Sequence, residues 1–342
     1  MPDALRTDRS VALADFLAAN GWRGKTPIVL AADASFRRYF RLADRDRSVV
    51  LMDAPPPQED VGPYIAVAGM LRDLGLSAPE IYAEDRQRGF LLIEDFGDDL
   101  YTRLLAKGAD EAGLYALAID TLIALHRAVH EAGAPTLAPY DAERLLAEAA
   151  LLVDWYAPSV LGTGLTADIR DEYLDHWRAV LAEVVAQTPT LVLRDYHVDN
   201  LMLLAGRPGV RACGLLDFQD AVCGAPGYDV VSLLEDARRD VPAALRDAMI
   251  ERYVAAFPAL DGSAFIRAAT ILSAQRNCKI LGIFTRLWRR DAKPGYLPHI
   301  PRVWRLLEGD LRREPALAPI ATWLDRHLPA EMRLRPASVS LR

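Results

Sequence analysis

The stretch LVLRDYHVDN, residues 191–200, places acidic, amide and imidazole side chains directly after a short apolar run. Asp195 is followed five positions later by Asn200, and Asp217 comes 17 positions after Asn200, inside LLDFQD. Polar groups at the end of a buried strand need partners or a chemical task, because burying them unpaired is costly. This order and spacing of Asp, Asn and Asp is typical of enzymes that transfer phosphoryl groups.

Each of the three residues has a role in that chemistry. An attacking hydroxyl needs a carboxylate that accepts its proton, and Asp195 is the candidate for this role. Magnesium prefers hard oxygen ligands, so Asn200 and Asp217 are the candidate metal ligands, and ATP is the expected phosphoryl donor. A single Asp at a strand end more often forms a turn or a helix cap. Three correctly spaced residues, each behind an apolar run, favour the catalytic interpretation.

The residues of this pattern need elements that hold them, and the chain predicts two lobes. Residues 1–94 form a small β-rich lobe with five short strands, expected to bind the nucleotide. Residues 95–99 are a hinge, and residues 100–342 form a large helical lobe for catalysis and substrate binding. The helical pattern is interrupted by short strands between about 190 and 220. A cleft between two lobes is a common place for a small-molecule site.

The composition narrows the class of protein. Hydrophobic residues make up 51% and charged residues 25% of the 342 residues, so the chain can bury a full core. The net charge is -7, from 40 basic and 47 acidic side chains. Proteins that bind nucleic acid usually have an excess of basic side chains, so this composition does not indicate nucleic-acid binding. Three cysteines without metal-ligand spacing indicate a reducing compartment. With no apparent signal peptide or membrane span, we expect a cytoplasmic monomer whose partner is a small molecule.

Several segments resemble those of a known family. LRDYHVDN is similar to the catalytic loop, and LLDFQD to the metal-binding segment, of the aminoglycoside phosphotransferase and choline kinase group. GYDVVSLLED, with Asp229, and LIALHRAVH, with His126, resemble two further segments of that group, the second being a helix beneath the catalytic loop. The resemblance implies an α+β, protein-kinase-like fold of two lobes, with ATP and Mg²⁺ as cofactors.

A narrower resemblance is carried by DASFRRYFRL, GFLLIEDFGD, LLDFQDAVCGAPGYDVVSLLEDAR and QRNCKILGIFTRL. These segments resemble the bacterial anomeric kinases of N-acetylmuramate and N-acetylglucosamine. That resemblance implies ATP-dependent phosphorylation of the C1 hydroxyl of an amino sugar to an α-1-phosphate. It also implies a place in peptidoglycan recycling, toward UDP-sugars.

Two positions depart from the kinase pattern. The position two residues before Asp195, where kinases usually carry an architectural His, is Leu193. The third strand carries Met52 where a Lys normally contacts the phosphates. The chain therefore needs another cation near the phosphates.

The candidate cations are three arginines of the preceding strand. Alternation places Arg37, Tyr39 and Arg41 on one face of that strand and Arg38 on the other, so only one set can line the nucleotide site. Arg37 and Arg38 are our candidates for phosphate contact, and an ordinary solvated edge is the alternative. Ser35, in the preceding turn, can offer its hydroxyl and backbone N–H to a phosphate.

Other candidates lie in the hinge and in the catalytic loop. Adenine is commonly held by backbone groups of such a hinge, so Glu94 and Phe96 are candidates by position. His197 is a candidate contact to the substrate, although bonding within its own loop is the alternative.

The segment SAQRNCKILGIFTRLWRR predicts a basic stripe on one helix. At about 100° per residue, Arg276, Lys279, Arg286 and Arg290 fall within one sector. A basic stripe can receive an anionic substrate group such as the carboxylate of N-acetylmuramate, or it can be a solvated helix face. Gln275, Arg276 and Lys279 are the candidate substrate contacts.

Two other functions fit parts of the pattern. A kinase of an aminoglycoside or of choline would also need Asp195, Asn200 and Asp217. Polycationic aminoglycosides need pockets lined by carboxylates, however, and the basic stripe argues against such a pocket. A nucleotide-binding pseudokinase that regulates a partner fits the Met52 position. The intact trio of Asp195, Asn200 and Asp217 argues against it.

Overall fold

The structure, a computed structural model, describes residues 2–32, 36–45, 47–133 and 135–333, with backbone only for residues 2–8, 31 and 32. The chain forms two compact units that are interleaved along the sequence. The first unit comprises Met1–Thr121 and Val198–Asp220, and the second comprises Leu122–His197 and Ala221–Arg342. The boundary therefore falls inside the catalytic-loop pattern, two residues after Asp195.

A five-stranded antiparallel sheet forms the core of the first unit, in the order β1-β2-β3-β5-β4. Its strands are β1 (Ile28–Ala32), β2 (Arg38–Asp44), β3 (Arg47–Asp53), β4 (Ile81–Asp85) and β5 (Phe90–Glu94). The five strands expected from the sequence are thus confirmed. In the register of the sheet, Met52 lies opposite Tyr39 of β2 and Leu91 of β5.

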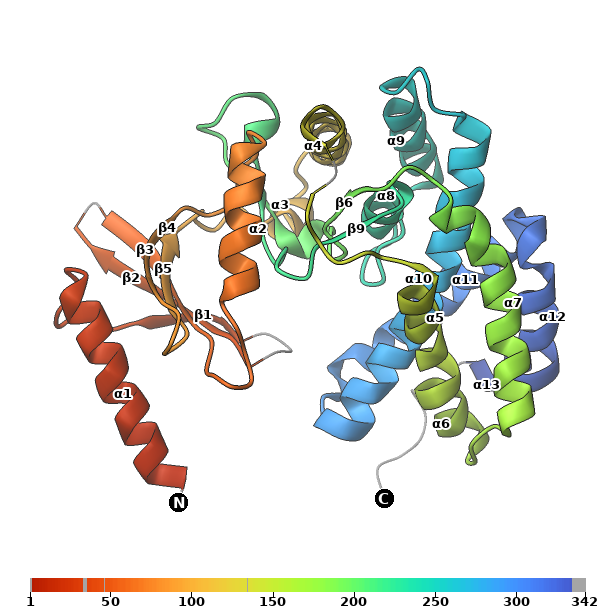
Figure 1. The fold of residues 1–342 in the computed structure, drawn as a ribbon, viewed down its shortest axis with the longest axis horizontal. Coiled ribbons are helices and arrows are strands. Elements are labelled where there is room, and N and C mark those ends of the chain that lie inside the picture. Colours follow the sequence, from red (N-terminus) through yellow and green to blue (C-terminus); the bar gives the residue numbers. More distant parts are fainter. Residues whose placement is uncertain (1, 33–35, 46, 134, 334–342) are drawn as a thin grey trace. The chain divides into compact units, whose positions relative to one another are not determined.

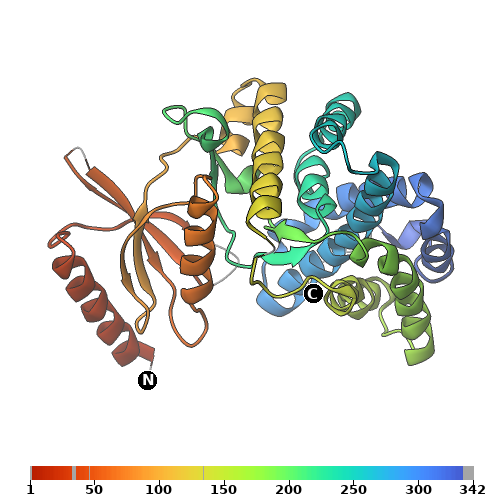
Figure 2. The same cartoon turned by 45° about the horizontal axis from the view of Figure 1, so that its top comes forward.

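Helices lie on both sides of this sheet (Figure 2). On one face, Phe16 of α1 (Pro2–Ala19) and Trp22 beyond it pack against Leu51 and its apolar neighbours. The other face, toward α2 (Gly62–Asp73), carries Val50 and Met52, because side chains alternate along β3. The strand alternation thus divides the sheet into a core face and a face available for a site.

The remainder of the first unit includes a short helix, a short two-stranded sheet and the beginning of a long helix, residues 111–121. α3 (Tyr101–Ala106) follows the proposed hinge. β7 (Leu201–Leu203) pairs antiparallel with β8 (Cys213–Leu215), with Leu201 opposite Leu215. Turns of 3-10 helix precede each strand, at Val198–Asn200 and Gly209–Ala212.

The second unit is helical and is organised around α10 (Gly262–Asp291), which packs against α5, α8 and α11 (Figure 1). Asp261 begins this helix as its N-cap, accepting from the backbone N–H groups of Ser263 and Ala264. A Cβ at Gly282 would lie 2.3 Å from the backbone of Leu151, so only glycine permits this close approach. The other helices are α5 (Ala142–Leu151), the π-helical turn Leu152–Tyr156, α6 (Ala157–Leu161), α7 (Ala167–Val185), α8 (Gly227–Leu234), α9 (Ala243–Ala255), the 3-10 turns Pro294–His299 and Pro315–Leu317, α11 (Ile300–Arg313), α12 (Ala318–His327) and α13 (Ala330–Arg333).

Two further elements complete the architecture. β6 (Thr190–Val192) and β9 (Val222–Gly224) form a two-stranded sheet in the second unit. α4 (Glu111–Ala132) is the one described helix that is long and apolar enough to cross a membrane by length and composition alone, and 56% of its most apolar window is buried inside the protein. A mostly buried apolar helix is also what the core of a helical unit requires.

Candidate active site

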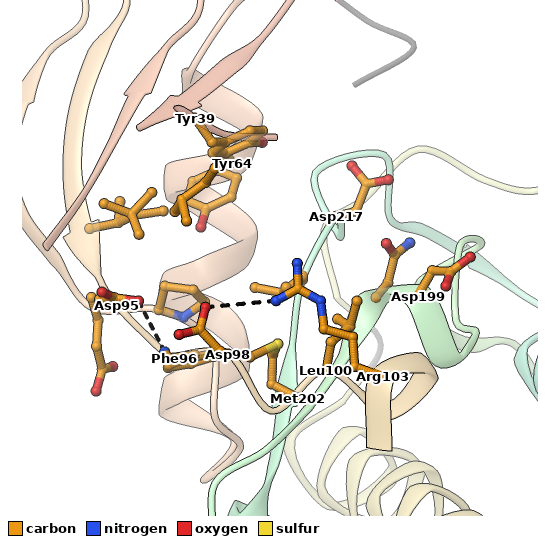
Figure 3. A pocket seen from close by; sticks show the side chains of 18 residues that line it. Tyr39, Tyr64, Asp95, Phe96, Asp98, Leu100, Arg103, Asp199, Met202 and Asp217 are labelled. Carbon is orange, nitrogen blue, oxygen red and sulfur yellow. Dashed lines mark hydrogen bonds and ion pairs between the residues drawn. The ribbon is translucent and has the colours of Figure 1, made fainter. Parts of the chain in front are cut away.

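A cavity of about 370 Å³ opens in the first unit (Figure 3). Its walls come from the available face of the sheet, from α2, from the hinge, and from the segments around β7 and β8. This volume is within the range of small-molecule sites in proteins. The proposed hinge residues Glu94 and Phe96 and both candidate metal ligands are among its lining residues.

The short β7–β8 sheet explains why Asn200 and Asp217 line the same cavity. Asn200 immediately precedes β7, and Leu216 follows β8 and donates its backbone N–H to the Asn200 carbonyl at 3.0 Å. Asp217 is the next residue and has a φ of 57°, in the left-handed region. Its Oδ1 accepts a hydrogen bond of 2.9 Å from the Gln219 amide. The strand pairing thus brings together an amide oxygen and a carboxylate that are distant in sequence.

These two residues suit a magnesium ion. Within the described part of the chain, no cluster of three or more His, Cys, Asp or Glu residues has the arrangement of a metal site. Magnesium is usually held by one or two protein oxygens together with substrate phosphates, so the Asn200–Asp217 pair fits the ion's preference.

The face of β2 (Arg38–Asp44) that carries Tyr39 and Arg41 is the one that faces the cavity, and Arg37 lies just before the strand. Tyr39 lines the cavity, and the Arg37 guanidinium lies 3.4 Å from Asp217 Oδ1 and 3.9 Å from Glu59 Oε2. Arg38 points to the other face and pairs with the buried carboxylate of Asp53. The structure therefore separates the two candidate arginines: Arg37 lies beside a candidate metal ligand, and Arg38 does not.

Arg41 connects the sheet to the hinge. Its guanidinium lies 2.7 Å from Asp95 Oδ2 and 3.0 Å from Asp98 Oδ1, and both carboxylates belong to cavity-lining residues. Burial alone would raise the pKa of Asp95, but hydrogen bonds from Arg41 and from the Gly97 backbone outweigh it and lower that pKa. Charge therefore ties the proposed hinge to β2.

The side chains of the proposed hinge residues Glu94 and Phe96 make structural contacts, and the backbone N–H of Glu94 donates to the Glu80 carbonyl at 2.8 Å. Glu94 forms an ion pair with Arg207, whose guanidinium lies 5.2 Å from the centre of the Phe96 ring. A Cβ at Gly214 would come within 2.8 Å of that ring, so the glycine leaves room for Phe96. Ser35, the proposed phosphate-covering residue, lies outside the described residues.

Asp195 belongs to the second unit, where a buried carboxylate shapes its loop. Asp229 Oδ2 accepts the Leu193 N–H at 2.6 Å, and its Oδ1 accepts the Arg194 N–H at 2.9 Å. Burial raises the pKa of Asp229 to about 7, even though these hydrogen bonds favour the ionised form. Arg194 has a φ of 70°, a conformation that few non-glycine residues adopt, and the two hydrogen bonds hold it there.

The electrostatic surroundings keep Asp195 ionised. Burial on its own would raise its pKa, but electrostatic interactions with its neighbours, the largest from Lys279, outweigh burial and lower the pKa. His197 itself is buried, and burial lowers its pKa. A carboxylate with a lowered pKa keeps its negative charge at neutral pH, as a proton acceptor must.

The basic stripe on α10 is partly buried and partly solvated. Arg276 and Lys279 are 6% and 9% exposed, whereas Arg290 is exposed and pairs with Asp291 at 2.7 Å. The solvated-face alternative is therefore wrong for the start of the stripe and correct for Arg290. Gln275 is fully buried and donates to the Leu145 carbonyl at 2.8 Å, which ties α10 to α5.

The chain matches the model of the phosphotransferase enzyme family over residues 27–266, well over half of its length. The chain belongs to this family. It is 38% identical to an N-acetylmuramate/N-acetylglucosamine kinase of Caulobacter vibrioides, over 96% of this chain and 99% of the relative. It is 40% identical to a kinase of the same name from Pseudomonas aeruginosa, over 91% of this chain and 92% of the relative.

The fold agrees with that membership. An ADP-bound aminoglycoside phosphotransferase matches 85% of this chain and 95% of its own, with a TM-score of 0.53 and 17% identity. The predicted α+β, protein-kinase-like fold and the predicted resemblance are thereby confirmed. The family's structural residues are also placed as expected: His126 is buried, with Nδ1 2.6 Å from the Tyr253 hydroxyl, and burial lowers its pKa to about 4.

The missing strand lysine of this phosphotransferase now has a candidate replacement. Met52 is fully buried, and the ion pair that kinases make between that lysine and a helix glutamate has a counterpart in Arg37 and Glu59, just before α2. We expect Arg37→Met to raise the KM for ATP by about tenfold or more, since a charge-assisted hydrogen bond is worth about 1.5–3 kcal/mol. Arg38→Met is the control, because Arg38 is the neighbouring arginine and pairs with Asp53, away from Asp217. Equal effects of the two changes on KM would contradict the assignment.

Sequence reasoning missed Glu148 and its aromatic neighbours. Glu148 accepts from Lys279 at 3.1 Å and also pairs with Arg194 and the Tyr140 hydroxyl. The Tyr228 hydroxyl lies 3.2 Å from Lys279 Nζ. One signal was present in the sequence: Glu148 interrupts an apolar helix face in LLAEAALL, where an acid needs a buried partner.

Proposed function

We propose that this phosphotransferase uses ATP to phosphorylate the anomeric C1 hydroxyl of N-acetylmuramate and N-acetylglucosamine. The products are the α-1-phosphates, formed in peptidoglycan recycling toward UDP-sugars, by a monomer in the cytoplasm. The observation that carries the proposal is the placement of Asn200 and Asp217 in one cavity with the hinge. The names of the two relatives at 38% and 40% identity support the choice of sugars.

The cavity of the first unit is the proposed nucleotide site. Adenine lies against the hinge and contacts backbone groups at Glu94 and Phe96, and Arg37 and Ser35 contact the phosphates. Asn200 and Asp217 would hold Mg²⁺, which when bound would neutralise charge on the phosphate oxygens. The ADP bound to a phosphotransferase of the same fold supports a nucleotide in this cavity.

Asp195 acts as the base of the reaction. It accepts the proton of the C1 hydroxyl while the hydroxyl oxygen forms a bond to the γ-phosphorus, and the bond from that phosphorus to the bridging oxygen of ADP breaks. Asp229 positions the loop by binding two of its backbone N–H groups. Catalysis rests mainly on orientation and on charge stabilisation.

The second unit supplies the proposed sugar contacts. His197, Gln275, Arg276 and Lys279 are the candidates, and three of them are cationic or can become so. A cationic environment suits an acidic sugar and disfavours a polycationic aminoglycoside or choline. This electrostatic preference separates the proposal from the other kinase functions.

The proposal is tested by identifying the product with phosphorus NMR after incubation with ATP, magnesium and each acceptor. We expect a sugar 1-phosphate signal with N-acetylmuramate and with N-acetylglucosamine, and no phosphorylated product with kanamycin or choline. Phosphorylation at another hydroxyl would overturn the anomeric assignment. Nucleotide binding without turnover of any acceptor would favour a regulatory pseudokinase.

A further inference from the structure

Arg276 is a mostly buried side chain whose charge lies near the carboxylates of Asp195 and Asp229. Its side chain belongs to a residue that is only 6% exposed, and it forms no hydrogen bond or ion pair with any described residue. Its nitrogen atoms are not among the fully buried polar atoms of the described residues that lack a hydrogen-bond partner, so they remain within reach of water or of a ligand. A mostly buried guanidinium with accessible donors is suited to bind an anionic group of a substrate.

The neighbouring polar groups of α10 are already engaged. Lys279, one turn away, contacts Glu148 at 3.1 Å and the Tyr228 hydroxyl at 3.2 Å. Gln275 donates to the Leu145 carbonyl. Of the three candidate contacts on α10, Arg276 is therefore the one whose side chain has no hydrogen bond or ion pair with another described residue.

The charges around Arg276 are mixed. Arg194 and Lys279 lie near the carboxylates Glu148 and Asp195, whose pKa values are both lowered. Arg276 interacts electrostatically with Asp195 and with the buried Asp229, so it lies in the neighbourhood of the proposed base. Arg276 is therefore placed to contact a substrate that Asp195 also contacts.

We propose that Arg276 binds the carboxylate of an acidic amino sugar, the lactyl ether carboxylate of N-acetylmuramate, and so sets the preference for it over the neutral N-acetylglucosamine. The planar guanidinium can donate two parallel hydrogen bonds to a carboxylate, which a lysine ammonium cannot match. This inference rests on the proposed sugar kinase function and adds the group that selects between its two substrates.

The test compares kcat/KM for the two sugars in the wild-type enzyme and in Arg276→Met, which keeps the length of the side chain and removes its charge. The ratio of kcat/KM for N-acetylmuramate to that for N-acetylglucosamine is expected to fall about tenfold to hundredfold, as for loss of a charge-assisted hydrogen bond. The methyl ester of N-acetylmuramate provides a second readout. The wild type should favour the acid over the ester, and the variant should lose that preference.

Arg289→Met is the matched control, because Arg289 is exposed on the same helix and contacts only Ser159 and Trp288 among the described residues. It should leave the ratio unchanged. An equal loss for both sugars in Arg276→Met would overturn the inference and make Arg276 a general structural or phosphate contact. Absence of turnover of either sugar by the wild type would instead refute the proposed function. If Arg276→Met does not fold, Arg276→Lys should still lower the ratio, and an unchanged ratio there would also overturn the inference.

Discussion

Asp195→Asn is expected to lower kcat by about 10²–10⁴-fold, the usual contribution of a positioned general base. The amide keeps the shape of the side chain but cannot accept the proton of the sugar hydroxyl. Nucleotide binding, measured by calorimetry, should change little, since Asp195 lies in the second unit and the nucleotide cavity is lined by the first. Steady-state kinetics with ATP and N-acetylglucosamine gives kcat directly.

Asp220→Asn is a suitable control, because Asp220 is exposed and close in sequence to the metal-binding segment. It should retain the kcat of the wild type. Unchanged kcat in Asp195→Asn would contradict its role as the base. The lowered pKa of Asp195 also predicts how kcat depends on pH. Because the group stays ionised to a lower pH than an ordinary Asp, loss of kcat through its protonation should begin only below the usual titration range of an Asp side chain.

Asp217→Ala is expected to weaken binding of ATP in the presence of magnesium by about tenfold or more, since even residues that only support metal ligands contribute about 10–100-fold to metal affinity. The change removes the one carboxylate of the proposed metal pair and leaves Asn200. It also removes the acceptor of the Gln219 and Arg37 contacts. Calorimetric titration of ATP with and without magnesium measures the effect.

Asp217→Asn separates the two consequences. It keeps an oxygen for Gln219 and Arg37 but lacks the negative charge, so it should lose most of the magnesium dependence while disturbing the local hydrogen bonds less. In EDTA, the affinities of both variants and of the wild type for ATP should be similar. If magnesium strengthened ATP binding equally in all three proteins, the metal would have to be held elsewhere.

Much of this molecule can be predicted from short-range patterns. The alternation in residues 27–94 predicts five strands, and five are found. The spacing of Asn200 and Asp217, each behind an apolar run, predicts a shared site, and the β7–β8 pairing places both in one cavity. Strand alternation and helical period are local properties of the backbone, so the sequence alone carries them.

The sequence by itself determined which residues share a face, and only the tertiary structure decided which face is covered. Alternation separates Arg37 from Arg38, but the segment that brings Asp217 beside Arg37 arrives from about 180 residues away. Helical period groups Arg276 and Lys279 with Arg290, but packing of α5 and α8 buries the first two and leaves the last in water. Burial depends on contacts between distant segments, and no local period encodes those contacts.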